Sequence, residues 1–170
     1  MPMIDPLLAE FEQEAATTRR VLERVPEDKL SWRPHPKSFS LGQLALHIAA
    51  GPKSIASAAA ADSLEYNFPS APEAKSREEL LDTFSDAVSC AVATLKPLTD
   101  EQLQANWTLT SKGQTVMSVP RAAFLRMVLL NHIYHHRGQL SVYLRLCNVA
   151  VPSIYGPSAD ESPFERSATA

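Results

Sequence analysis

The sequence predicts an all-α protein, a four-helix bundle with long crossover connections. Three observations lead to this prediction: a composition rich in helix formers, four long amphipathic segments, and proline-rich stretches between them. Alanine and leucine together number 43 of the 170 residues, against 15 for valine and isoleucine, and that balance favours helices over sheets. The 13 prolines then have to lie between helices or in their first turns.

Each helix is expected where apolar residues recur at spacings of three and four. Asp5 as an N-cap and Pro6 at the first helical position predict the start of the first helix. Asn148 is suited to a left-handed stop after the last one. The four helices are expected at about 6–25, 40–61, 76–95 and 120–147.

Two capping boxes give the sharpest boundaries. Ser40 and Gln43 form an S-x-x-Q box, and Ser76 and Glu79 form an S-x-x-E box. In such a box the two side chains satisfy each other's free backbone amides at the start of a helix. The second and third helices are therefore expected to begin at these serines.

The connections at 62–75 and 96–119 are too long for tight hairpins, so at least one is expected to cross the bundle. Within the second connection, a small β-hairpin could form at about 106–118. No composition shift marks a domain boundary. We expect a single domain over 1–161 and a disordered C-terminal tail over 162–170.

The charge and cysteine content excludes several classes of protein. The formal net charge is −3, which lacks the basic footprint needed for nucleic acid or an anionic membrane surface. Two cysteines, Cys90 and Cys147, are too few for a disulfide framework and are expected as small core residues. The N-terminus has no signal-peptide pattern and no segment is apolar over the ~20 residues that a membrane span needs. A soluble cytoplasmic protein is expected.

Five histidines are present, and three of them fall within five residues. At ~100° per residue, His132 and His136 are expected near the middle of the apolar face of their helix, and His135 at its edge. Buried imidazoles need a polar partner. A divalent metal supplies one, because histidines four residues apart on a helix converge on one ion. Core histidines satisfied by water or a carboxylate are an equally good interpretation of this pair alone.

His47 changes that balance because it also lies on an apolar helix face, beside Leu44 and Ile48. A single buried histidine more often packs against a backbone carbonyl. Together with His132 and His136, however, it would complete a site with three nitrogen ligands, which is typical of catalytic rather than structural metals.

The other candidate residues receive simpler interpretations. His35 stands between two prolines and is expected to be exposed in a loop. Arg137 and Arg145 point away from the apolar stripe and are expected to form ion pairs with a neighbouring helix.

Two motifs resemble those of the DinB/YfiT family. Residues 40–49 (SLGQLALHIA) resemble the family's second-helix motif, and residues 132–140 (HIYHHRGQL) resemble its H-x-x-x-H-R-x-Q motif. The flanking segments 25–34 (with VP and LSWRP) and 151–161 (VPSIYGPSADE) are also similar. The resemblance covers about residues 5–161.

This resemblance implies a four-helix bundle that is usually a homodimer. It also implies a divalent metal, zinc or nickel, bound by His47, His132 and His136, with no ligand role for His135. Some relatives resemble metal-dependent hydrolases, and others resemble S-transferases that use low-molecular-weight thiols.

The leading hypothesis is a metal-dependent enzyme, a hydrolase or a thiol S-transferase, that acts on a small molecule. Gln139 and Tyr155 are predicted to contact the substrate, with the segment around Tyr155 folded over the mouth of the site. The lack of an obvious carboxylate partner favours thiolate chemistry. The alternative is a non-catalytic bundle stapled by its metal, or a stress-response binding module.

Overall fold

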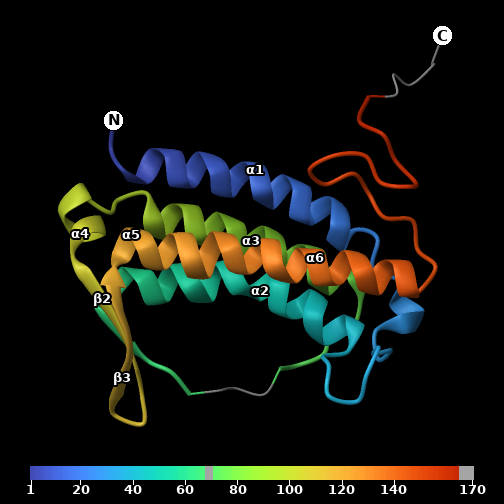
Figure 1. The fold of residues 1–170 in the computed structure, drawn as a ribbon, viewed down its shortest axis with the longest axis horizontal. Helices are drawn as coiled ribbons and strands as arrows, with labels where there is room; N and C mark the ends of the chain where they lie inside the picture. The colour runs from blue at the N-terminus through green and yellow to red at the C-terminus, as the bar shows by residue number, and fades with distance from the viewer. Residues whose placement is uncertain (68–70, 165–170) are drawn as a thin grey trace.

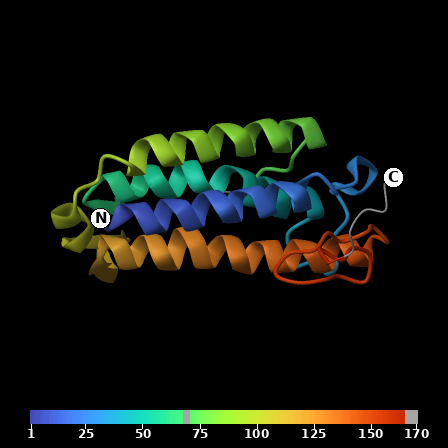
Figure 2. The ribbon, with the colours of Figure 1, turned by 90° about the horizontal axis from the view of Figure 1, so that it is seen from above.

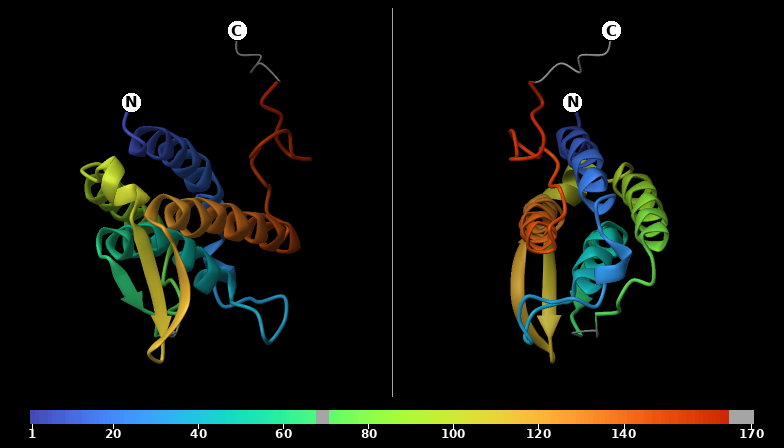
Figure 3. Two further views of the ribbon diagram at one scale, coloured as in Figure 1. Left: turned by 60° about the vertical axis from the view of Figure 1, so that its left-hand side comes forward. Right: turned by 90° about the vertical axis from the view of Figure 1, so that its right-hand side faces the viewer.

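The computed structural model describes residues 1–67 and 71–164, and it is mostly helical (Figure 1). Four long helical rods lie side by side, and a small sheet extends from one end of them (Figures 1 and 3). Among the described residues, no helix is both long and apolar enough to cross a lipid bilayer. The main elements are α1 (Ile4–Leu22), α2 (Leu41–Ala60), β1 (Ser63–Glu65), α3 (Arg77–Leu95), α4 (Asp100–Gln104), β2 (Asn106–Ser111), β3 (Gln114–Pro120), α5 (Arg121–Phe124), the π-helical segment η2 (Leu125–Leu130) and α6 (Asn131–Leu146).

The connection between α2 and α3 crosses the length of the bundle, as predicted. The chain leaves α2 at the sheet end and returns to the opposite end before α3 begins, so the two helices run in the same direction (Figure 1). α3 packs against both α1 and α2, and α6 packs against both α1 and α2 from the other side. In cross-section the rods therefore form a ring in the order α1, α3, α2 and α6.

Of the two predicted capping boxes, the structure contains one in full and one in part. The capping box of α2 is complete: the Ser40 hydroxyl accepts from the Gln43 amide at 3.2 Å, and the Gln43 side chain accepts from the Ser40 amide at 2.9 Å. At α3, Ser76 caps the Glu79 amide, but the Glu79 carboxylate accepts from the Lys75 amide instead of from Ser76. The second box is thus only half formed.

Asp5 is not the N-cap of the first helix. α1 begins one residue earlier, at Ile4, and no side chain of its own caps it. The Oδ1 atom of Asp100, at the start of α4, accepts from the Met3 amide at 2.7 Å. A residue 97 positions away thus bonds a backbone amide at the start of the helix, which no local pattern could predict.

The all-α prediction with a possible small hairpin requires a correction, because the described residues include a three-stranded sheet. The expected hairpin is present: β2 and β3 are antiparallel, and Lys112 and Gly113 at the turn both have positive φ, as a two-residue type I′ turn requires. β1 was not predicted. It has three residues, all exposed, and it pairs with β2 in parallel, so neither length nor alternation marked it as a strand.

The fourth rod is continuous but not a uniform α-helix (Figure 2). A π-helical stretch over Leu125–Leu130 separates α5 from α6, where a single helix from 120 to 147 was expected. The helix ends as predicted, with Asn148 in the left-handed conformation at φ 59°. The extra residue in the π-helical turn shifts the faces of α6 relative to the residues before it.

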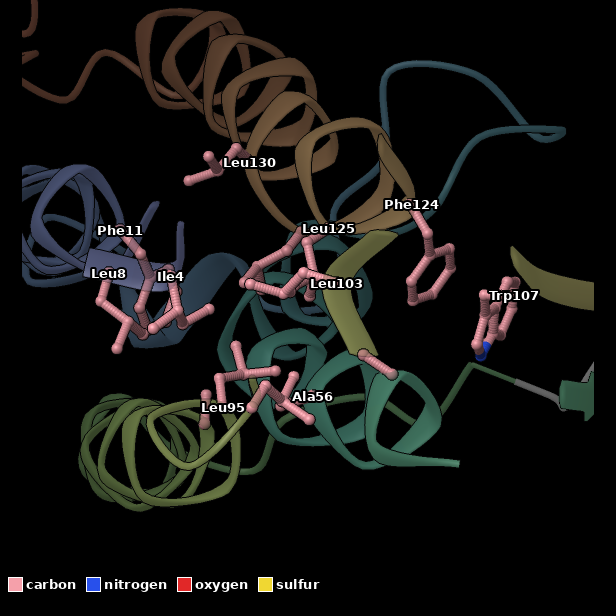
Figure 4. Packing of buried hydrophobic residues seen from close by; sticks show 14 of the residues in the cluster. Ile4, Leu8, Phe11, Ala56, Leu95, Leu103, Trp107, Phe124, Leu125 and Leu130 are labelled. Carbon is pink, nitrogen blue, oxygen red and sulfur yellow. The ribbon is translucent and has the colours of Figure 1, made fainter. Parts of the chain in front are cut away.

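The apolar core has two halves, one near the sheet and one near the opposite end of the bundle. In the first half Trp107 of β2 stacks on Phe124 with ring centroids 3.7 Å apart, and Trp107 donates to the Ala58 carbonyl (Figure 4). On α6 the first half ends at Ile133 and the second begins at Leu140. Polar side chains occupy the level between them.

The C-terminal segment lies along α1 and α6. Arg20 donates to the Ser153 carbonyl and pairs with Glu161, and Arg145 pairs with Asp160. The predicted tail at 162–170 falls outside the described residues from position 165 onward.

Candidate metal centre

His47 lies in the second turn of α2, and Glu73 and Leu30 pack closely against the start of this helix. The Glu73 carboxylate accepts from the hydroxyls of Ser31 and Ser40, so a negative charge lies at the positive end of the helix dipole. At Gly42 a Cβ atom would lie 2.9 Å from the Glu73 side chain and 3.1 Å from the Leu30 carbonyl. This close packing fixes the rotation of α2 and with it the direction of His47.

His132 and His136 are one turn apart on α6, directly after the π-helical segment. Both are half-buried, as is His47 on the facing helix. In α6 the fully buried stripe consists of Ile133, Arg137, Leu140 and Leu144. The two histidines therefore lie at the edge of the inward face, on the side of α2, and the predicted position at its middle was wrong.

The three rings direct their Nε2 atoms toward one another. His132 Nε2 lies 3.2 Å from His47 Nε2 and 3.0 Å from His136 Nε2. One nitrogen from each of the three histidines lies within 4.8 Å of the others. The ring planes are steeply inclined to one another, at 73°, 86° and 84°, so the rings converge by their edges instead of stacking.

Two further side chains contact the histidines. His136 Nδ1 and Gln139 Oε1 are 2.7 Å apart. Because an amide oxygen can only accept, His136 carries its proton on Nδ1 in this pair, and its Nε2 lone pair is free. The Phe39 ring lies 5.7 Å from the His47 ring, centroid to centroid, and is 39% exposed.

Burial keeps the histidines neutral. It lowers the pKa of His132 to about 4, and the neighbouring rings of His136, His47 and His135 add to the effect, because a proton on any of them would repel another. Burial also lowers the pKa of His47 and of His136. At neutral pH the three rings are therefore in the form that binds metals.

The donor set fits a divalent metal ion. Ligand nitrogens at about 2.0–2.1 Å from an ion are separated by roughly 3–3.4 Å, close to the observed 3.0 and 3.2 Å. A ligating histidine normally donates its other ring N–H to an oxygen acceptor, which is the role of Gln139. Three imidazole nitrogens are a typical ligand set for zinc, and imidazole also suits nickel.

The structure does not bring Tyr155 together with these histidines. Its hydroxyl donates to Glu14 Oε2 at 2.8 Å and accepts from Arg137 at 2.5 Å. Tyr134 and Arg137, which its ring contacts, lie on the other side of α6 from His132 and His136. The C-terminal segment therefore does not cover the site at this tyrosine. Gln139 does lie at the site, as a partner of His136, and its contact with a substrate stays a prediction.

The structure agrees with some of the predictions for the remaining candidate residues and not with others. His35 is exposed, as expected, and His135, which was expected at the edge of the apolar face, is exposed as well. Cys90 and Cys147 are only half-buried, and Cys147 packs against the second half of the core. Arg145 pairs with Asp160 of the C-terminal segment and not with a helix.

Arg137 does pair with a neighbouring helix, but it points inward. It is 1% exposed and its partner Glu14 on α1 is 6% exposed. Sequence reasoning missed Glu14, although one signal was present: it lies three residues after Phe11 and four before Thr18, which is the spacing of one helix face, and both of these residues are buried. A charge on that stripe needs a buried partner.

Taken together, the fold and the histidines define a class of protein: a helical bundle with a three-histidine candidate metal centre between two of its helices. The chain belongs to the DinB family, whose family model matches residues 2–167. The resemblance inferred from the two motifs is thereby confirmed.

Individual relatives extend over almost the whole chain. It is 30% identical over 161 residues to the uncharacterized protein YrdA of Bacillus subtilis (strain 168), an alignment that covers 93% of this chain and 91% of YrdA. A DinB-like protein from Bacillus cereus ATCC 10987 has a similar crystal structure, with a TM-score of 0.72, 26% identity, and coverage of 89% of this chain and 97% of that one.

A second solved structure shares the fold at lower identity. The DinB-like protein YjoA of Bacillus subtilis matches with a TM-score of 0.65 and 22% identity, over 85% of this chain and 92% of its own. This similarity supports the arrangement of the helices.

Proposed function

We propose that this protein binds one divalent metal ion, zinc or nickel, through His47, His132 and His136, and uses it to act on a small molecule. The observation that carries the proposal is the convergence of three neutral Nε2 atoms at 3.0 and 3.2 Å, with His136 oriented by Gln139. Three protein ligands are typical of catalytic sites, because a structural zinc site is normally closed by a fourth.

The bound metal would supply Lewis acidity, either for activating water in a hydrolysis or for holding a thiolate in an S-transfer. The residues of the chain provide the rest. Gln139 holds the proton on His136 Nδ1, and the exposed face of Phe39 offers an apolar surface beside His47. Within the described residues, no carboxylate joins the close group of possible ligands. This favours thiol transfer, since a thiolate held as nucleophile needs no general base beside it.

Metal binding and catalysis are tested separately. Titration of the purified protein with Zn²⁺ and with Ni²⁺ should show one site per chain, retained in His135→Ala and lost in His132→Ala. A screen of thiol-transfer, ester and amide substrates on the metal-loaded protein should then find an activity that His132→Ala lacks. A folded wild-type protein that binds neither ion contradicts the proposal at its first step.

The non-catalytic alternative makes the opposite prediction for stability. If the metal only staples the bundle, the metal-free wild type and the variant carrying His47→Ala, His132→Ala and His136→Ala should both lose the cooperative unfolding transition of the loaded protein. We expect both to stay folded and to unfold cooperatively at nearly the same Tm, because the core halves on either side of the site are apolar and do not include the histidines.

We further propose that the protein is a homodimer that pairs through the outer face of α6. Exposed apolar side chains recur along this face and the η2 segment before it: Met127, Val142 and Leu146 are 49–56% exposed. Gly138 lies midway, and a Cβ atom built there would meet nothing within 4 Å. A glycine costs about 1 kcal/mol relative to alanine inside a helix, and a close crossing of two helices is a reason to keep one.

The oligomeric state tests this proposal through Gly138→Ala. In a monomer the alanine should stabilise α6 by about 0.5–1 kcal/mol. In a dimer that crosses at Gly138 it should weaken association, which light scattering across a dilution series would detect. An unchanged dimerisation constant would rule out this face.

A further inference from the structure

Arg137 immediately follows the metal-ligand candidate His136, but it lies on the side of α6 that faces α1. Its guanidinium donates to the Glu14 carbonyl and to Thr18 Oγ1, both at 3.1 Å, and to Glu14 Oε2 at 2.6 Å. The hydroxyl of Tyr155 closes the group by bonding both charged partners. Within the described residues, the hydrogen bonds of the guanidinium are thus made with α1 or with the segment that lies along it.

Packing alone does not explain an arginine at this position. Its neighbours in the buried stripe of α6 are Ile133, Leu140 and Leu144, and a leucine at 137 would continue the stripe. Burying an ion pair costs free energy that apolar residues of similar volume avoid, so such pairs add little net stability. They can, however, fix one arrangement of the elements that they join.

The acceptors of Arg137 restrict α6 to one position relative to α1. The Glu14 carbonyl, the Glu14 carboxylate and the Thr18 hydroxyl lie within one turn of α1, and the planar guanidinium has a rigid donor geometry. An apolar contact tolerates rotation of a helix, because its energy depends weakly on angle. Hydrogen bonds weaken steeply when their geometry is lost, so rotation of α6 would break several bonds of a buried charge at once.

Small rotations of α6 matter at the histidines. Atoms at the surface of a helix lie about 5–6 Å from its axis, so a rotation of about 10° moves them by about 1 Å. Metal–ligand distances tolerate only about 0.2 Å. His47 is on another helix, so the distance from its Nε2 to that of His132 depends directly on the rotation of α6.

We propose that Arg137 is a positioning residue for the histidine centre: by anchoring α6 to α1 through Glu14 and Thr18, it sets the rotation that brings His132 and His136 toward His47. The expected effect on metal affinity rests on the proposed function. The expected effect on the positions of the three Nε2 atoms does not require a metal.

The test is the double variant Glu14→Leu/Arg137→Met, which replaces the ion pair by apolar side chains of similar size. Exchanges of this kind are often neutral or stabilising, so the variant is expected to fold. Its crystal structure should show His132 Nε2 displaced by about 1 Å or more from its position 3.2 Å from His47 Nε2. The Kd for Zn²⁺, measured well below the Tm, should rise by about tenfold or more, and the absorption spectrum of the Co²⁺-loaded protein should change.

The matched control is Arg145→Met, which removes an exposed arginine from the same helix and should change neither the geometry nor the Kd. An unchanged separation of the Nε2 atoms in the double variant would overturn the inference. So would a lower Tm accompanied by wild-type metal affinity and an unaltered Co²⁺ spectrum, since that is the result of a purely structural role.

Two further outcomes remain decisive. If the double variant does not fold, Arg137→Lys takes its place, because lysine keeps the charge but lacks the planar fork, and the same displacement is expected. If the wild-type protein binds no metal, the proposed function fails, while the Nε2 separation in the crystal structure still decides the role of Arg137.

Discussion

Two polar clusters lie on opposite sides of α6, and they differ in how their hydrogen bonds are satisfied. Toward α1, Arg137, Glu14, Thr18 and Tyr155 supply donors and acceptors that match one another. Among the described residues, the buried side-chain nitrogen that lacks a partner is Arg121 Nε, outside this cluster.

Toward α2, the three histidines bring mainly lone pairs together. His136 has its ring proton directed at Gln139, so its Nε2 can only accept, and three Nε2 atoms share a small space. A single cation accepts a lone pair from all three rings at once, whereas a ring proton on one Nε2 atom removes that atom as a lone-pair donor. The comparison indicates that a closed polar cluster orders helices, whereas a cluster with unmatched acceptors is suited to a ligand.

The largest effect is expected when the buried Arg137–Glu14 ion pair is broken. Arg137→Met alone leaves the buried Glu14 carboxylate without its cation and should lower the free energy of unfolding by about 3–5 kcal/mol. Adding Glu14→Leu should restore most of the loss. Urea denaturation of the metal-free proteins measures both changes. Wild-type stability in the single variant would mean that the pair is not buried in solution.

Binding of a metal ion to the three histidines should have the next largest effect on stability. Zn²⁺ at 100 times its Kd is expected to raise the free energy of unfolding by about 2.7 kcal/mol, because it binds the folded chain. The rise should disappear in His47→Ala and persist in His35→Ala, whose side chain is an exposed loop residue. Thermal unfolding with and without the ion measures it. An equal rise in both variants would place the metal elsewhere.

Variants of Gln139 test whether this side chain strengthens metal binding by orienting His136, without binding the metal itself. Gln139→Leu removes the acceptor for His136 Nδ1 and should weaken metal binding by about 10- to 100-fold. Gln139→Glu keeps an oxygen acceptor and should retain the affinity of the wild type. Isothermal titration with Zn²⁺ gives both constants. Weakened binding in the glutamate variant alone would show that the oxygen is not what His136 requires.

The comparison also shows where sequence reasoning succeeded. His47, His132 and His136 could be selected because helical spacing and a family motif both indicate them. The hairpin and the start of α2 followed from local chemistry, since positive φ at Lys112 and Gly113 and the Ser40 box depend on residues close in sequence. Contacts between residues that are far apart in the sequence could not be predicted in this way.

The faces of α6 illustrate the limit. A wheel that advances ~100° per residue from Phe124 assumes one uniform helix, but the π-helical turn over Leu125–Leu130 changes the phase before His132. The wheel therefore placed the histidines at the centre of the apolar face and Arg137 outside it. Tyr155 was misplaced for a different reason: its partner Glu14 is 141 residues away, and only the tertiary fold brings the two together.

The smallest expected effect on stability comes from Glu10, on α1 one turn before Glu14. Hydrogen bonds from Arg126 and from Tyr134 hold the pKa of Glu10 below its usual 4.5. A carboxyl whose pKa is lowered by folding stabilises the native state above its unfolded pKa, and it loses that contribution as the pH falls through the folded value. Because Glu10 and Arg126 are partly exposed, solvent screening reduces the contribution to the order of 0.5 kcal/mol.

Glu10→Gln should therefore be less stable than the wild type at pH 7, and the difference should shrink as the pH falls below 4.5 and through the lowered pKa of the carboxyl. Urea denaturation over a series of pH values measures it, with Glu12→Gln, an exposed neighbour on the same helix, as the control. A difference that stays constant with pH would mean that Glu10 acts by packing.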